Sequence, residues 1–122
     1  MTLLGHIGLD LDTRSCRLAL AGEVDGTSAP QMRDALNQLA AAPPRAVTVD
    51  LAQTTFFDAN GARFLLAVHD LVATAGGRVT VVGAADPIRR VLAFTRLDRV
   101  LDIRDPDTVT TPTPVGAGGS VR

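Results

Sequence analysis

No lysine occurs in this sequence: all 12 of its basic residues are arginines. A phosphate-binding Walker loop and a Schiff-base mechanism both require a lysine, so both are excluded. Aromatic residues are also scarce, because tryptophan and tyrosine are missing and only four phenylalanines are present. The formal net charge of -1 leaves no basic excess to neutralise phosphates, so we expect no direct contact with nucleic acid.

The sequence also has a single cysteine and no long apolar run. Cys16 is the only cysteine, so it cannot form an intramolecular disulfide, and this usage is typical of a reducing compartment. No apolar run approaches the roughly 18 residues that a membrane span requires. The first residues, MTLLGHIG, lack the basic leader of a signal peptide. We therefore expect a cytoplasmic protein with no membrane span.

The residue patterns that carry catalysis or hold a metal are also missing. His6 and His69 lie far apart in the sequence, and neither belongs to a cluster with metal-ligand spacing. His69 and Asp70 are neighbours on a predicted helix, so we expect that their side chains do not face each other. No Gly-x-Ser-x-Gly nucleophile motif occurs. We expect a protein that is not an enzyme and that has no metal site and no cofactor.

The length and composition indicate one folded domain. A chain of 122 residues has room for a single core, and 46% hydrophobic with 20% charged residues is a globular balance. From Asp105 onward, prolines and glycines replace large apolar residues. We predict a domain over 1–104 and a disordered tail over 105–122.

Strands are indicated by two-residue alternation. Apolar and polar residues alternate over 7–12 and over 16–20, and the short segment 13–15 between them predicts a hairpin. Val47 and Val49 would share one face of a later buried strand. The remaining predicted strands cover 45–51, 78–82 and the end of 97–103.

Three segments show helical spacing of apolar residues. Ser28 and Gln31 fit a capping box at the start of the first helix, which Pro43 and Pro44 end. Asp86 is expected to cap the third helix. The second helix follows a predicted loop over 52–59, begins near Asn60 and ends at Gly76-Gly77.

The alternation of these elements predicts an α/β fold. Two strands precede a regular succession of helices and strands, which favours a mixed four- to five-stranded sheet with its helices packed mainly on one face. Phe56 and Phe57 fall in the loop before the second helix; we expect one in the core and the other exposed.

Three stretches resemble the STAS family, in particular its anti-sigma factor antagonist (anti-anti-sigma factor) type. LALAGEVDGTSAPQMRDAL (18–36) is similar to the first family signature, a strand leading into a Gly-Glu-hydrophobic-Asp loop and a helix. AVTVDLAQTTFFDANGARFLL (46–66) is similar to the second, in which a Phe-x-Asp-Ser-Ser-Gly-like loop starts a helix. GGRVTVVGAADPIRRVLAFTRLDRVLDI (76–103) resembles the closing strand and helix. The three occur in the family's order and spacing.

The resemblance implies a STAS fold and a bacterial protein-binding regulator of transcription. Such a domain binds an anti-sigma factor, often a histidine-kinase-like ATPase, and so releases a sigma factor. Phosphorylation of the serine before the loop glycine breaks the complex. The alternative is a STAS scaffold subunit of a stress-signalling or transport complex. We expect a monomer or a weak dimer.

The chain departs from the family pattern at the phosphoacceptor. Asp58 and Gly61 match the family residues, whereas Ala59 and Asn60 replace the two serines. Asn60 takes the phosphoacceptor position and carries no hydroxyl. It could also serve only as a helix N-cap, a role in which serine or aspartate would replace it at little cost. Asp25 could likewise be a partner contact or a turn residue. The resemblance and the loop positions predict a partner-binding face made of Asp25, Thr27, Phe57, Asp58, Ala59, Asn60 and Gly61.

Overall fold

The computed structural model describes residues 6–11 and 15–104, and these form one five-stranded sheet. The strands lie side by side in chain order, β1-β2-β3-β4-β5. β1 runs antiparallel to β2, as the predicted hairpin requires, and the later pairs are parallel. The predicted tail lies outside the described residues. The elements are β1 (His6–Leu11), β2 (Ser15–Val24), η1 (Gly26–Ser28), α1 (Ala29–Ala41), β3 (Ala46–Phe57), α2 (Ala59–Thr74), β4 (Arg78–Val82), α3 (Asp86–Phe94), η2 (Leu97–Arg99) and β5 (Asp102–Arg104).

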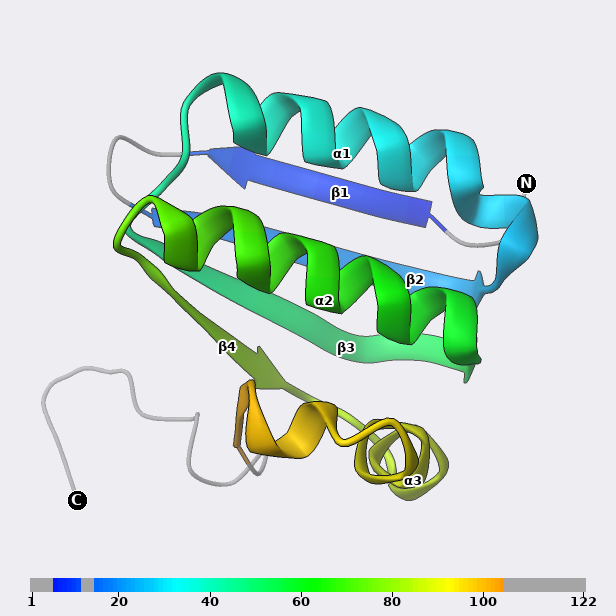
Figure 1. The fold of residues 1–122 in the computed structure, drawn as a ribbon. Coiled ribbons are helices and arrows are strands. Elements are labelled where there is room, and N and C mark those ends of the chain that lie inside the picture. The colour runs from blue at the N-terminus through cyan, green and yellow to red at the C-terminus, as the bar shows by residue number, and fades with distance from the viewer. Residues whose placement is uncertain (1–5, 12–14, 105–122) are drawn as a thin grey trace, which may run out of the picture.

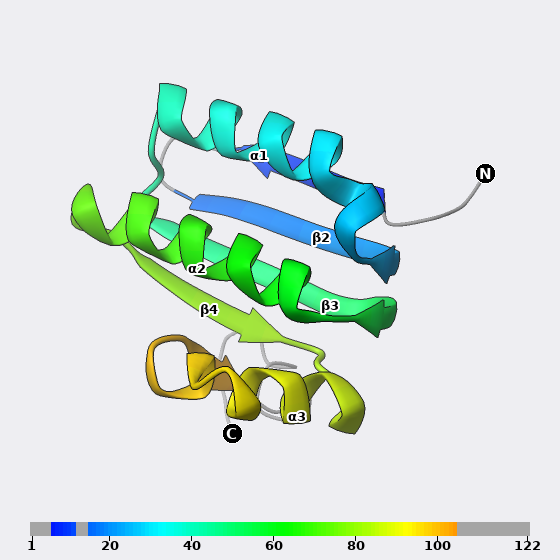
Figure 2. The ribbon, with the colours of Figure 1, turned by 45° about the vertical axis from the view of Figure 1, so that its right-hand side comes forward.

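The helices pack on one face of the sheet. α1 and α2 run side by side over β1, β2 and β3, and α3 lies at the β4 side of the molecule (Figures 1 and 2). Val47 and Val49 on β3 are fully enclosed beneath the helices, whereas Thr48 and Asp50 alternate with them and are half-buried. This two-residue alternation buries a single apolar face, which confirms the predicted mixed sheet with helices on one side.

The two central strands are longer than the sequence predicts. Residues 52–57, expected to be a loop, continue β3, and β2 continues to Val24. The pairing of β2 with β3 continues past the register shifts between the two strands and ends with Val24 beside Phe57. The Thr54 hydroxyl donates a 2.7 Å hydrogen bond to the Leu20 carbonyl inside this stretch. Register irregularities break the alternation by which strands are recognised, and this explains the wrong boundary.

Two of the predicted helix caps are wrong. Ser28 precedes α1 but its side chain makes no cap bond to that helix. Asp86 is already the first residue of α3, which follows Ala85 without a side-chain cap. The predicted end of α2 is confirmed: Gly76 adopts a φ of 86°, and the Gly77 N–H donates to the Val72 carbonyl at 2.9 Å.

Candidate functional site

The two loops singled out in the sequence meet at the carboxyl ends of β2 and β3. Asp25 follows the last residue of β2 and Asp58 follows the last residue of β3. The backbone N–H of Asp58 donates to the Val24 carbonyl at 3.4 Å. A Cβ added to Gly26 would lie 3.6 Å from Asn60 Nδ2, so the first loop contacts the start of α2. Parallel neighbouring strands thus bring together residues that are more than thirty positions apart.

Asp25 organises the turn after β2. Its Oδ1 accepts hydrogen bonds from the Thr27 N–H at 2.9 Å and from the Thr27 hydroxyl at 2.6 Å. The Asp25 N–H donates to Ser28 Oγ at 3.3 Å, and the Ser28 hydroxyl donates to the Glu23 carbonyl at 3.2 Å. The capping box therefore joins Asp25 to Ser28 and not Ser28 to Gln31. Asp25 is a turn residue in this structure, and its half-buried carboxylate still reaches solvent.

Asp58, and not Asn60, is the N-cap of α2. Its Oδ1 accepts from the Asn60 N–H at 2.9 Å and from the Gly61 N–H at 3.4 Å. These are two of the donors that the start of a helix leaves without backbone partners. Asn60 is consequently the second residue of the helix, which corrects the capping role considered for it.

The Asn60 side chain is held at both ends. Its Nδ2 donates to Asp58 Oδ2 at 3.3 Å, and its Oδ1 accepts from an Arg63 guanidinium nitrogen at 3.0 Å. An amide offers a donor and an acceptor on one short side chain, so it can bridge an aspartate and an arginine. Arg63 was not among the predicted site residues, although its position three residues after Asn60 places it on the same helix face.

The two hydrogen bonds of the Asn60 side chain, called the clamp below, change the loss of stability expected when Asn60 is substituted. We expect Asn60→Ser to lower the free energy of unfolding by about 0.5–1.5 kcal/mol, because serine cannot keep both bonds. Asn60→Asp keeps the arginine partner but faces the Asp58 carboxylate, so we expect a loss of about 1 kcal/mol and no gain from the helix dipole. Urea unfolding at neutral pH measures both changes. An Asn60→Asp protein as stable as the wild type would show that the clamp contributes nothing.

Phe57 supports the site from inside. Only 5% of Phe57 is exposed, whereas 50% of Phe56 is exposed, so the expected division between core and surface is confirmed. A Cβ added to Gly61 would come within 2.6 Å of the Phe57 ring. The ring thus occupies the space that any larger residue at position 61 would need. Phe57 and Gly61 are both buried, and this corrects their place among surface contacts: they position the loop from beneath.

The accessible part of the site is small and polar. Thr27, Ala59 and Arg63 are exposed, and Asp25, Asp58 and Asn60 are half-buried. Thr54, a hydroxyl close to the site in sequence, is buried and already hydrogen-bonded, whereas Thr55 is exposed. Within residues 6–11 and 15–104, no group of three or more histidines, cysteines or carboxylates could hold a metal ion. None of the helices in that part of the chain could span a bilayer.

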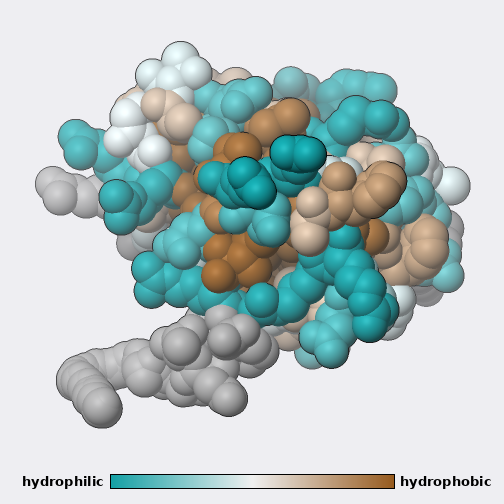
Figure 3. All heavy atoms as spheres, turned by 60° about the horizontal axis from the view of Figure 1, so that its bottom comes forward, coloured by the Kyte–Doolittle hydropathy of each residue, from teal (hydrophilic) through white to brown (hydrophobic). Residues whose placement is uncertain are grey.

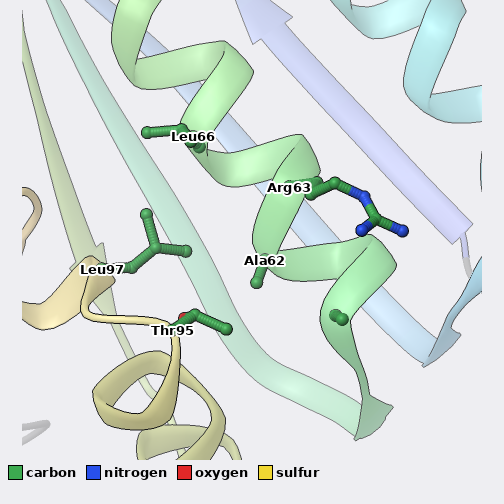
Figure 4. Close-up of a pocket in the computed structure, with 6 residues that line it drawn as sticks. Ala62, Arg63, Leu66, Thr95 and Leu97 are labelled. Carbon is green, nitrogen blue, oxygen red and sulfur yellow. The ribbon is translucent and has the colours of Figure 1, made fainter.

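A groove of about 200 Å³ adjoins this surface. It lies between α2 and the segment that follows α3, where Leu66 and Leu97 point toward each other and Ala62 faces Thr95 (Figure 4). Ala59 lines the groove and also belongs to the polar surface, so the two features are contiguous. The Arg63 guanidinium is turned away from the groove, toward the Asn60 side (Figure 4).

The fold is shared with several solved proteins. An anti-sigma factor antagonist from Mycobacterium paratuberculosis is 23% identical with a TM-score of 0.71, over 81% of this chain and 84% of that one. The Bacillus cell fate determinant SpoIIAA, in its phosphorylated form, is 18% identical with a TM-score of 0.66, over 82% of this chain and 90% of that one. A STAS-domain anti-sigma factor antagonist from Planctomyces limnophilus is 19% identical with a TM-score of 0.69, over 80% and 87%.

Sequence comparison gives the family directly. No curated protein sequence matches the chain. The family model described as "Mlab, STAS domain" matches residues 7–104, which is most of the chain and nearly all of the described part. Because that match covers the strands, the helices and both loops of the candidate site, the chain belongs to the STAS family.

Proposed function

We propose that this chain is a bacterial, cytoplasmic regulatory module that binds an anti-sigma factor and so releases a sigma factor, without catalysing a reaction. The structural likeness to anti-sigma factor antagonists supports the partner class. The partner face is formed by the Asp25 turn and the first turn of α2, with Thr27, Ala59 and Asn60 accessible on it. The module acts as a monomer or weak dimer and does not itself contact nucleic acid.

The observation that carries the proposal furthest is the clamped Asn60. The residue before the loop glycine is where the family resemblance places a phosphoserine, and here an amide is fixed between Asp58 and Arg63. A phosphate would add about -1.5 to -2 charges at this turn. With no hydroxyl at position 60 to accept it, the first turn of α2 keeps one charge state. We infer that the module is constitutively competent to bind and is controlled by its abundance.

Binding to anti-sigma factors from the same genome tests the partner face. Asp25→Asn keeps the acceptor oxygen that caps the turn, and asparagine caps as well as aspartate, so only the charge is removed. We expect calorimetry to show about tenfold weaker binding, a change of about 1.4 kcal/mol. Asp34→Asn on the exposed side of α1 is the matched control and should bind like the wild type. Equal affinities for all three proteins would exclude the Asp25 turn from the interface.

The missing switch has its own test. After incubation with an anti-sigma kinase and ATP, we expect no phosphate on the wild-type chain and one phosphate on the Asn60→Ser variant. Intact-mass and peptide spectrometry measure both. Thr55 is the exposed hydroxyl nearest in sequence, so phosphate there would mean that the switch has moved along β3 and was not lost. That result would contradict constitutive binding.

A second candidate is favoured by one observation. A STAS scaffold subunit of a transport or stress-signalling complex would need a permanent binding face. The clamped Asn60 suits that role equally, because a scaffold requires no phosphorylation. Binding to an ATPase subunit of a transporter, with no affinity for any anti-sigma factor of the genome, would establish this alternative.

A further inference from the structure

Near its carboxyl end, β3 carries two residues more than the stretch of β2 with which it pairs. One extra residue lies between the pairs that Ala19 and Ala21 of β2 form, and the other lies between the pairs that Gly22 and Glu23 form. Such β-bulges are over-represented beside functional sites, where they change the direction of a side chain. The second of them lies just before the Asp58 turn, so the candidate site begins where the strand is irregular.

The second bulge decides which of two phenylalanines lies in the core. Thr54 is buried, so a strict two-residue alternation would bury Phe56 next and expose Phe57. The extra residue, Thr55, shifts the alternation by one position, and Phe57 is buried while 50% of Phe56 is exposed. The bulge therefore places the Phe56 ring on the face of the sheet that no helix covers.

Position, and not exposure alone, distinguishes Phe56, because single exposed apolar side chains are ordinary on a protein surface. The described part of the chain exposes three other large hydrophobic residues, Leu66, Phe94 and Val100. The face on the α3 side also shows apolar surface near its centre, with hydrophilic groups around it (Figure 3). Phe56 differs from the other three because it lies on β3, two residues before Asp58, and so belongs to the edge of the sheet that carries the candidate site.

A carboxylate lies opposite the ring. Glu23 of β2 is the pairing partner of Phe56, and it is exposed on the same face of the sheet. The Asp25 carboxylate follows two residues later and reaches solvent. Within residues 6–11 and 15–104, no basic side chain forms an ion pair with either carboxylate. The complement of an aromatic ring beside two such charges is a surface that offers an apolar pocket and a basic side chain.

We propose that Phe56 is the apolar anchor of the partner contact, and that the partner receives its ring in an apolar pocket and places a basic side chain against Glu23. Aromatic residues are among the types that contribute most to binding at the centres of interfaces, and charge pairs around them fix the orientation of the partner. The contact then extends from the first turn of α2, around the carboxyl ends of β2 and β3, onto the helix-free face. This inference rests on the proposed function, because it names the chemistry of the partner that binds the same site.

Calorimetry with the anti-sigma factors and the transporter ATPase subunits encoded in the same genome tests the anchor. Phe56→Thr removes the ring and keeps a residue type that favours a strand. We expect this variant to bind at least about tenfold more weakly than the wild type. Phe94→Ala is the matched control, because it removes a ring that is 89% exposed on α3, and it should bind like the wild type. Equal affinities for the wild type and Phe56→Thr would overturn the proposal.

The basic side chain of the partner is tested through Glu23. Glu23→Arg reverses the charge and retains the backbone carbonyl that accepts from the Ser28 hydroxyl. We expect binding to weaken at least about tenfold, and we expect added salt to weaken the wild type more than Glu23→Gln. Asp34→Arg, exposed on α1, is the control for charge reversal and should bind like the wild type. A Glu23→Arg protein that binds as tightly as the wild type would refute the pairing with a basic side chain.

Thermal unfolding separates the loss of a partner contact from the loss of folding. Phe56→Thr should melt within about 4 °C of the wild type, because half of the Phe56 side chain is already in solvent. A larger drop would show that the ring packs within its own chain, and this would overturn its role as an anchor. Concentration-dependent dimerisation that Phe56→Thr abolishes would show that a second copy of the chain covers the ring, and it would overturn the proposal as well.

The outcomes also separate this inference from the proposed function. Anti-sigma factor binding that requires Asp25 and is unchanged in Phe56→Thr would keep the proposed function and remove the anchor. Binding to a transporter ATPase subunit that weakens tenfold in Phe56→Thr, with no affinity for any anti-sigma factor, would keep the anchor and remove the sigma-factor role. A chain that binds neither class of protein would remove both.

Discussion

Replacing Gly61 with alanine is expected to lower the free energy of unfolding by about 1–3 kcal/mol, although alanine normally favours a helix over glycine. The reason is the Phe57 ring, which lies within 2.6 Å of the position that the new Cβ would occupy. Phe57 is buried at the end of β3, so its ring cannot swing into solvent without opening the core. Urea or thermal unfolding measures the change.

Gly26→Ala is the matched control for this prediction. A Cβ there would meet Asn60 Nδ2 at 3.6 Å, an ordinary contact, so the stability should change by less than about 0.5 kcal/mol. A double variant with Phe57→Leu should lose less than the sum of the two single losses, because the smaller side chain leaves room for the methyl group. A Gly61→Ala protein that is as stable as the wild type would show that the ring does not constrain position 61.

Asp58→Ala should cost about 1–2 kcal/mol, the usual loss for an N-cap, and should also release Asn60. Asp58 accepts from two backbone N–H groups at the start of α2 and from the Asn60 amide. Asp58→Ser retains an acceptor oxygen at the cap and should lose less than half as much. Chemical unfolding ranks the three proteins. Equal losses for serine and alanine would mean that the charge, and not the hydrogen bonds, stabilises the helix start.

Sequence patterns were sufficient to predict the sheet but not to predict where its central strands end. Alternating apolar residues such as Val47 and Val49 mark a strand whose one face is buried, and this alternation survives in the structure. Beyond Leu51, both Ala52 and Gln53 are exposed, so the alternation fails while the pairing with β2 continues. A register irregularity is a property of two strands together, so it cannot be read from one stretch of sequence.

The location of the candidate site was predictable from the sequence, but its hydrogen bonds were less so. Asp25 and Asp58 each follow a strand, and parallel neighbours place such residues at one edge. Asp58 and Asn60 are equally good capping types, so the choice between them depends on where β3 ends. Once β3 reaches Phe57, Asp58 is the only one of the two that precedes the helix. Arg63 donates a hydrogen bond to Asn60, which lies three residues earlier on the same helix face. This contact becomes predictable only once the first residue of the helix is known.

The strictly consecutive order of the strands has a consequence for synthesis. Each strand of the described chain pairs with the strand made just before it, so a chain emerging from the ribosome need not hold any segment unpaired until a distant one appears. The turn after β2 and the turn after β3 belong to successive units, and both exist once α2 has been translated. The groove beside α2 is completed later, because Thr95 and Leu97 follow α3. A nascent chain thus acquires the polar face first and the apolar groove only after α3 has been translated.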